Sequence, residues 1–212
     1  MTALNRFLLR VLLWLPVCFG AWYFLSVLFT VPLALTVDAL MGWVFPDLVE
    51  HVTQKGNELT VITRAVVSVQ AGSGARTGDI LLELNPLKYA YSMPLYTALV
   101  LAVSGEEWPK TRRWLAGMLI LLAVQVFGVA TEILKVLALD LGEEGRELLG
   151  FPAWGYEGVV LAYQLGFLIL PPVAPIAIWF GQFQDGLNSL TGEAGWTKGQ
   201  REPPSRSQRR KP

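Results

Sequence analysis

The sequence contains very little of the side-chain chemistry on which most metalloproteins and many enzymes depend. Among its 212 residues there is one cysteine, Cys18, and one histidine, His51. A single cysteine excludes a disulfide within the chain and a cysteine-based metal cluster, and a single histidine excludes a multi-histidine metal site. The chain also has no visible internal repeat or nucleotide-binding loop. We expect no metal, no cofactor and no nucleic-acid partner.

Charged side chains are also scarce. They make up 16% of the residues, whereas hydrophobic residues make up 53%. This composition is too apolar for a soluble domain of this size and indicates an integral membrane protein. The formal net charge is zero, so the position of each charge along the chain is more informative than the sum.

Four apolar stretches predict an all-α polytopic membrane protein with about four transmembrane helices. A helix that crosses the hydrocarbon core needs about 20 mostly apolar residues. Three stretches meet this length, and a shorter one has tyrosines typical of the membrane interface. The first stretch is too long for the apolar part of a signal peptide, so we expect it to remain as a span. The predicted spans are residues 8–35, 87–104, 114–139 and 158–183.

The basic residues predict the orientation. Basic residues near the ends of spans favour the cytoplasmic side. They lie before the first span, between the second and third spans, and in the C-terminal tail, whereas the other two connections are mainly acidic. Both termini are therefore expected in the cytoplasm. In the N-terminal segment and the connection between the second and third spans, these basic residues are Arg6, Arg10, Lys110, Arg112 and Arg113.

Three further segments complete the predicted layout of a membrane domain, residues 1–183. Val31 to Phe45 continues beyond Pro32 with spaced polar residues, which is typical of an amphipathic helix at the outer interface. Residues 46–86 form an extracytoplasmic β-rich insertion, in which "NELTVITRAVVSV" and "DILLEL" predict a small β-hairpin. Residues 184–212 form a basic tail that we expect to be disordered and to contact anionic lipids.

Two charged residues, Glu132 and Lys135, lie within the third span. Three residues apart on a helix, they share a face and can pair in part. One reading is a substrate site or a proton path, because ionisable groups in a span are costly and usually face the bundle interior. The other is structural, because the pair lies toward the outer end of its span, where lysine can extend to the interface. Gln125, seven residues earlier, favours an interior polar patch.

The order of these features resembles the core of the exosortase and archaeosortase family of membrane transpeptidases. The resemblance runs from Leu8 to Phe183 through "GDILLEL", "NPLKYAYSMPLYTALVLAV", "KTRRW", "LAVQVFGVATEILKVL" and "YEGVVLAYQLGF". Within that group, the chain is most similar to the exosortase H-associated membrane proteins. The resemblance implies a bacterial inner membrane, an exosortase H partner, and contact with the proteins that exosortase H sorts.

The resemblance also implies that thiol transpeptidase chemistry is absent. An exosortase has a cysteine in the segment that returns into the membrane, an arginine in the next span and a histidine in the last. This chain has Tyr91 and Ser92 in the first position, Lys135 in the second, and Tyr163 with Gln164 in the third. We therefore predict no catalytic residues. The predicted intramembrane polar patch consists of Asn85, Tyr91, Ser92, Glu132, Lys135 and Gln164.

Three functions remain open from the sequence. The first is a non-catalytic accessory protein that assembles with exosortase H or presents its substrates. The second is an acyl-transfer enzyme that uses Ser92 or Tyr91 with Lys135, because serine and lysine pairs support this chemistry without histidine. The third is a small transporter or channel subunit, suggested by the prolines that interrupt the last span and by the charged pair in the third.

Overall fold

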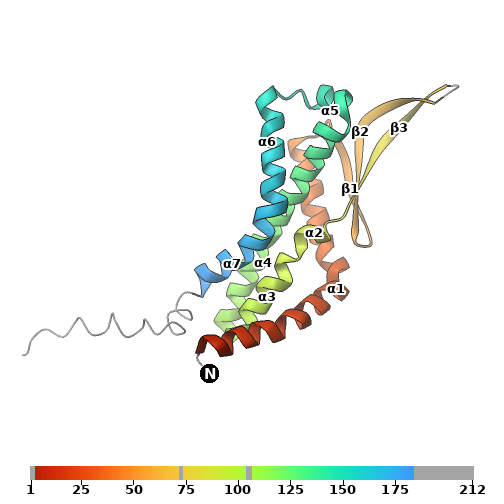
Figure 1. The fold of residues 1–212 in the computed structure, drawn as a ribbon. Coiled ribbons are helices and arrows are strands. Elements are labelled where there is room, and N and C mark those ends of the chain that lie inside the picture. Colours follow the sequence, from red (N-terminus) through yellow and green to blue (C-terminus); the bar gives the residue numbers. More distant parts are fainter. Residues whose placement is uncertain (1–2, 72–73, 104–106, 184–212) are drawn as a thin grey trace, which may run out of the picture.

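A bundle of helices carries a small sheet at one end (Figure 1). The computed structural model describes residues 3–71, 74–103 and 107–183, so the predicted tail, 184–212, lies outside the described residues. The sheet is antiparallel, in the order β1 (Val49–Lys55), β2 (Glu58–Ala71) and β3 (Gly74–Leu84). The helices are α1 (Ala3–Val44), α2 (Leu87–Ala90), α3 (Ser92–Ala102), α4 (Glu107–Lys135), the π-helical η1 (Val136–Asp140), α5 (Gly142–Leu149), α6 (Ala153–Gln164), the π-helical η2 (Leu165–Ile169) and α7 (Leu170–Gln182).

Within the described ranges, three helical segments are long and apolar enough to cross a membrane. They are Leu4–Val44, Trp108–Asp140 and Ala153–Gln182. They agree with three of the four predicted spans and confirm the helical membrane fold with a small sheet. The other predicted span, residues 87–104, consists of the short helices α2 and α3 in succession, so the number of spans stays a prediction. The α3 helix packs against α1, α4 and α7.

The segment Trp108–Asp140 is longer than a membrane requires. Its 33 residues extend over about 50 Å at 1.5 Å a residue, whereas the hydrocarbon core is about 30 Å thick. This segment therefore either tilts strongly or extends beyond the hydrocarbon core. The same argument applies to α1, whose 42 residues form one continuous helix that bends sharply in Figure 1.

The C-terminal part of α1 is packed against the sheet. The sequence predicted a separate amphipathic helix from Val31 to Phe45, but these residues continue α1, which ends at Val44. Pro32 removes one backbone donor without ending the helix, and the hydroxyl of Thr36 donates to the Pro32 carbonyl oxygen at 2.6 Å. Near this proline, the side-chain amide of Gln54 donates to the Val27 carbonyl oxygen at 3.0 Å. This contact ties the sheet to α1 one residue before Leu28, whose carbonyl oxygen loses its helical donor to Pro32.

The sheet has one strand more than the predicted hairpin. The strands β2 and β3 agree with the two predicted runs, and β1 pairs with β2 through a turn at Gly56 and Asn57. Gly56 has a φ of 64°, which glycine adopts without strain. The sequence of β1, "VEHVTQK", is too polar to be recognised from hydrophobic alternation, since Val49 and Val52 are its only buried residues.

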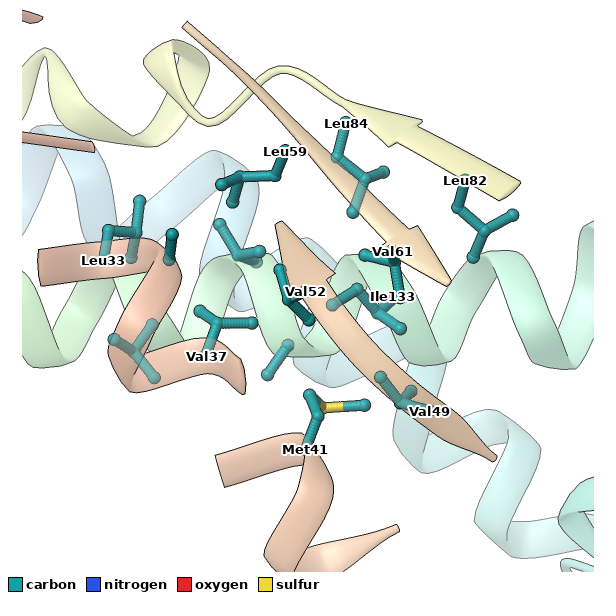
Figure 2. Close-up of a cluster of buried hydrophobic side chains, with 14 of the residues drawn as sticks. Leu33, Val37, Met41, Val49, Val52, Leu59, Val61, Leu82, Leu84 and Ile133 are labelled. Carbon is teal, nitrogen blue, oxygen red and sulfur yellow. The ribbon is translucent and has the colours of Figure 1, made fainter. Parts of the chain in front are cut away.

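One hydrophobic core joins the sheet to the helices. Figure 2 shows side chains from α1, α4 and all three strands converging between these elements. The Asp38 carboxylate on α1 also accepts a hydrogen bond from the backbone N–H of Val52 at 2.7 Å, which fixes the β1 edge against the helix. The sheet is therefore part of the main fold. The labelled core residues are Leu33, Val37, Met41, Val49, Val52, Leu59, Val61, Leu82, Leu84 and Ile133.

A second cluster lies at the opposite end of the bundle. The ring of Phe7 at the start of α1 stacks on Trp179 of α7, with the ring centres 5.3 Å apart. The buried Tyr96 of α3 places its hydroxyl 2.6 Å from the amide oxygen of Gln182 and 3.0 Å from the backbone carbonyl oxygen of Arg113. This end is thus closed by contacts among α1, α3, α4 and α7.

We predict that Gly117→Ala destabilises the bundle. A methyl group at Gly117 would lie 2.1 Å from the Tyr96 hydroxyl oxygen, and that ring is buried and held by its hydrogen bond to Gln182. The expected cost is about 1–3 kcal/mol, the usual range for overpacking. It is measured as a lower unfolding midpoint in detergent. In Gly158→Ala the methyl group meets no atom within 4 Å, so this control should keep or raise the midpoint. Equal midpoints for the two variants would contradict the proposed contact.

Candidate functional site

Three polar side chains meet inside the bundle near the sheet. Glu132 of α4 accepts a hydrogen bond from the Tyr89 hydroxyl at 3.0 Å through one carboxylate oxygen. Its other oxygen accepts from the ammonium group of Lys88, which also forms an ion pair with it. The Glu132 side chain is only 10% exposed and that of Lys88 is 33% exposed. We name Lys88, Tyr89 and Glu132 the Glu132 cluster.

The local sequence explains why α2 presents two partners to α4. The side chain of Asn85 accepts from the backbone N–H of Leu87 at 3.0 Å, a local turn that starts α2 directly after β3. The carbonyl oxygen of Pro86 then accepts from the N–H of Tyr89 at 3.0 Å. As a result, consecutive residues of a one-turn helix reach the same carboxylate.

Aromatic rings surround the lysine in the Glu132 cluster. The ammonium group of Lys88 lies 5.5 Å from the ring centre of Tyr89 and 5.8 Å from that of Phe167. Phe167 meets Tyr89 edge to face at 6.0 Å and stacks on Tyr163 at 5.7 Å. The cation is thus held by the carboxylate and by two aromatic faces, which attract positive charge.

Close packing keeps Tyr89 in this position. A methyl group at Gly128, one turn before Glu132, would lie 2.5 Å from the Tyr89 ring. A methyl group at Gly166 of η2 would in turn lie 3.0 Å from the Cα atom of Gly128. The two glycines therefore allow α2, α4 and η2 to approach closely around the Glu132 cluster.

Lys135 has a different partner from the one that the sequence predicted. Its ammonium group donates to both carboxylate oxygens of Asp140, at 2.7 and 3.0 Å, and lies 5.9 Å from the ring centre of Tyr163. The predicted pairing with Glu132 is wrong because Lys88 reaches Glu132 from another helix. Lys135 and Asp140 are five residues apart, and on an α-helix such residues point in different directions. The π-helical η1 has more residues in each turn and therefore places Asp140 next to Lys135.

The other residues of the predicted patch have separate environments. Asn85 is exposed and forms the turn before α2, Tyr91 is half-buried, and Gln164 is exposed on α6. Ser92 is buried and donates to the Tyr89 carbonyl oxygen at 3.3 Å. Gln125 is buried, and its amide nitrogen has no hydrogen-bond partner among the described residues. Of the predicted patch, only Glu132 belongs to the Glu132 cluster.

Sequence reasoning missed Lys88 and assigned Tyr89 to the membrane interface. A lysine at the start of an apolar segment is ordinary, so nothing local indicates that it faces inward. A usable signal was the requirement that an acid within a span has a cation nearby. Lys88 is the basic residue at the matching end of a neighbouring predicted span.

The arrangement is suited to holding helices together. Both carboxylate oxygens of Glu132 accept from other members of the Glu132 cluster, and the Ser92 hydroxyl is bound to backbone. Cys18 is buried in α1, whereas His51 is exposed on β1 with its ring 3.8 Å from Asp38. Among the described residues, no three histidine, cysteine or acidic side chains could together hold a metal ion.

The comparison with known families now adds to this geometry. A family model described as exosortase H-associated membrane protein matches residues 1–186. The chain belongs to this family. No curated protein and no solved structure matches the chain. Membership in the exosortase H-associated family agrees with the apolar helices of a membrane protein and supports an accessory role beside exosortase H.

For the exosortase H-associated protein we predict that the Glu132 cluster behaves as one unit. Glu132→Gln and Lys88→Met should each lower the unfolding free energy by about 1–3 kcal/mol, less than for a fully buried pair because Lys88 is partly exposed. The double variant should lose less than the sum, because neither charge is left alone. Unfolding in detergent measures all three.

The matched control for this prediction is Lys135→Met. It removes a lysine from a more exposed ion pair and should cost less than about 1 kcal/mol. A loss at Lys135 as large as that at Lys88, or strictly additive losses in the double variant, would show that the Glu132 cluster has no special role in stability.

Proposed function

We propose that this exosortase H-associated protein is a non-catalytic accessory subunit of the bacterial inner membrane, which assembles with exosortase H and helps present its protein substrates. The family match over residues 1–186 is the observation that carries the proposal. It covers the membrane helices, the sheet and the Glu132 cluster together. The proposed role therefore concerns the whole fold.

The hydrogen-bond partners of Ser92 and Lys135 support a role without catalysis. An acyl-transfer enzyme needs a nucleophile within hydrogen-bond reach of a base that can take its proton. The Ser92 hydroxyl donates to a backbone carbonyl oxygen, and Lys135 is paired with Asp140. Tyr91 has no base hydrogen-bonded to it among the described side chains. These contacts favour an accessory protein over the alternative enzyme.

The proposed orientation places the sheet where it could meet sorted proteins. If the basic residues at the start of α4 lie in the cytoplasm, the sheet end of the bundle is extracytoplasmic. Exposed tryptophans occur at both ends, with Trp108 at the basic end and Trp43 and Trp154 near the sheet. In Figure 1 the β2–β3 pair extends away from the helices, so its outer edge is accessible to another chain.

We predict that exosortase H is recovered with the tagged protein from its native host. The test is crosslinking in cells, extraction in mild detergent, affinity purification and mass spectrometry. Exosortase H should be enriched over a tagged, unrelated protein of similar span number. Its absence, in extracts where it is itself detected, would reject a stable assembly.

We predict that sorting does not depend on Ser92 or Lys135 as catalytic groups. In a strain without the native gene, Ser92→Ala and Lys135→Met should each restore processing of the sorted protein to the wild-type level. Glu132→Leu is the destabilised comparison variant, in which processing should fall only as far as the abundance of the protein, measured in parallel, falls. Loss of processing in Ser92→Ala at normal abundance would support the acyl-transfer alternative.

A further inference from the structure

A groove opens at the end of the bundle opposite the sheet, between the start of α4 and the end of α7. Its volume is about 330 Å³, at the small end of the range for ligand sites. The groove shares no residue with the Glu132 cluster, and this chain alone forms it. Its lining residues are Pro109, Arg112, Arg113, Ala116 and Gln182.

The polar groups of this groove are donors. Arg112 and Arg113 contribute two guanidinium groups, and no carboxylate of the described residues lines the groove. The amide oxygen of Gln182 already accepts from the Tyr96 hydroxyl at 2.6 Å, so the amide nitrogen is the part that can serve a ligand. Two positive charges with an amide donor match an anion with several acceptor oxygens, and guanidinium groups suit phosphate in particular.

Packing orients one of the two arginines. The guanidinium of Arg113 lies 5.5 Å from the ring centre of Phe183, which is buried. The backbone carbonyl oxygen of Arg113 is also close to the Tyr96 hydroxyl. Within the described part of the chain, no acidic side chain is paired with Arg112 or Arg113. Their charges thus remain available to a ligand.

The surroundings favour a lipid over a soluble anion. Trp108, 76% exposed at the start of α4, is a side chain typical of the membrane interface. From the groove toward the middle of the bundle, α4 exposes Leu115 and Leu119, which share a helix face with Arg112. A molecule with its phosphate at the arginines could therefore place its acyl chains along this apolar face of α4.

We propose that this groove binds the phosphate headgroup of an anionic phospholipid. The site is built into the helices and is separate from the contacts expected of the C-terminal tail. The lipid proposal does not depend on the accessory function. It rests only on the two arginines, the Gln182 amide and the adjoining apolar surface. The bound lipid would fill the space between α4 and α7 at this end.

The test is native mass spectrometry of the full chain in detergent, titrated with phosphatidylglycerol. Arg112→Gln combined with Arg113→Gln should weaken the first binding step by about tenfold, because two charge-assisted contacts are lost. Arg6→Gln combined with Arg10→Gln removes the same charge from the same end of the bundle, where Phe7 contacts Trp179. This control should change the affinity less than about twofold if the groove is the site.

Two further measurements make the test decisive. Arg112→Gln alone leaves the Arg113–Phe183 contact in place, so a loss of about threefold or more with an unchanged unfolding midpoint supports the site even if the double variant is unstable. Phosphatidylcholine should bind more weakly than phosphatidylglycerol by a similar factor. Equal losses in the groove and control pairs would overturn the proposal.

The same titration separates a membrane lipid from a free anion. Glycerophosphoglycerol, the headgroup without acyl chains, and inorganic phosphate should not displace phosphatidylglycerol at millimolar concentration. Displacement by either compound would show that the groove recognises a soluble phosphate, and the lipid proposal would be wrong. Retention of the lipid against both would support a site that uses headgroup and chains together.

Discussion

The carboxylate of Glu132 lies inside an apolar bundle, where little water can hydrate it. Other groups of the chain must therefore supply its hydrogen bonds and its counter-charge. Lys88 supplies the opposite charge and Tyr89 a hydroxyl donor. Both partners come from α2, the single turn of helix between the last strand and α3. The requirement to satisfy one acid therefore fixes the connection between the sheet and the helices, and Gly128 provides the space that this connection needs.

The chain separates its polar chemistry into two regions with different physical character. At the sheet end, charges are paired within the protein and enclosed by aromatic rings. At the opposite end, Arg112 and Arg113 have no acidic partner among the described residues and border an open groove. Removing one member of a buried ion pair is costly, whereas charges exposed to solvent contribute little to folding. The first region thus organises the fold, and the second is the one that we propose to bind a lipid headgroup.

The sequence could predict those features that depend on neighbouring residues, but not those that depend on contacts between distant segments. Apolar length identified the three long helices, and alternation identified β2 and β3. The same reasoning placed Glu132 in a polar site but chose Lys135 as its partner, since residues three apart on an α-helix are neighbours. Two non-local facts decide the actual partners. They are the approach of α2 to α4, and the π-helical turn that directs Lys135 to Asp140. Neither leaves a local pattern in the sequence.

The contacts between the β1–β2 turn and α1 join two distant parts of the chain. The Ser26 hydroxyl lies 3.0 Å from the side-chain oxygen of Asn57, and the Val27 carbonyl oxygen accepts from the side-chain amide of Gln54 at 3.0 Å. Gln54 and Asn57 flank Gly56 in the turn, whereas Ser26 and Val27 lie in the middle of α1. The sheet therefore lies alongside the C-terminal half of α1 rather than beyond its end.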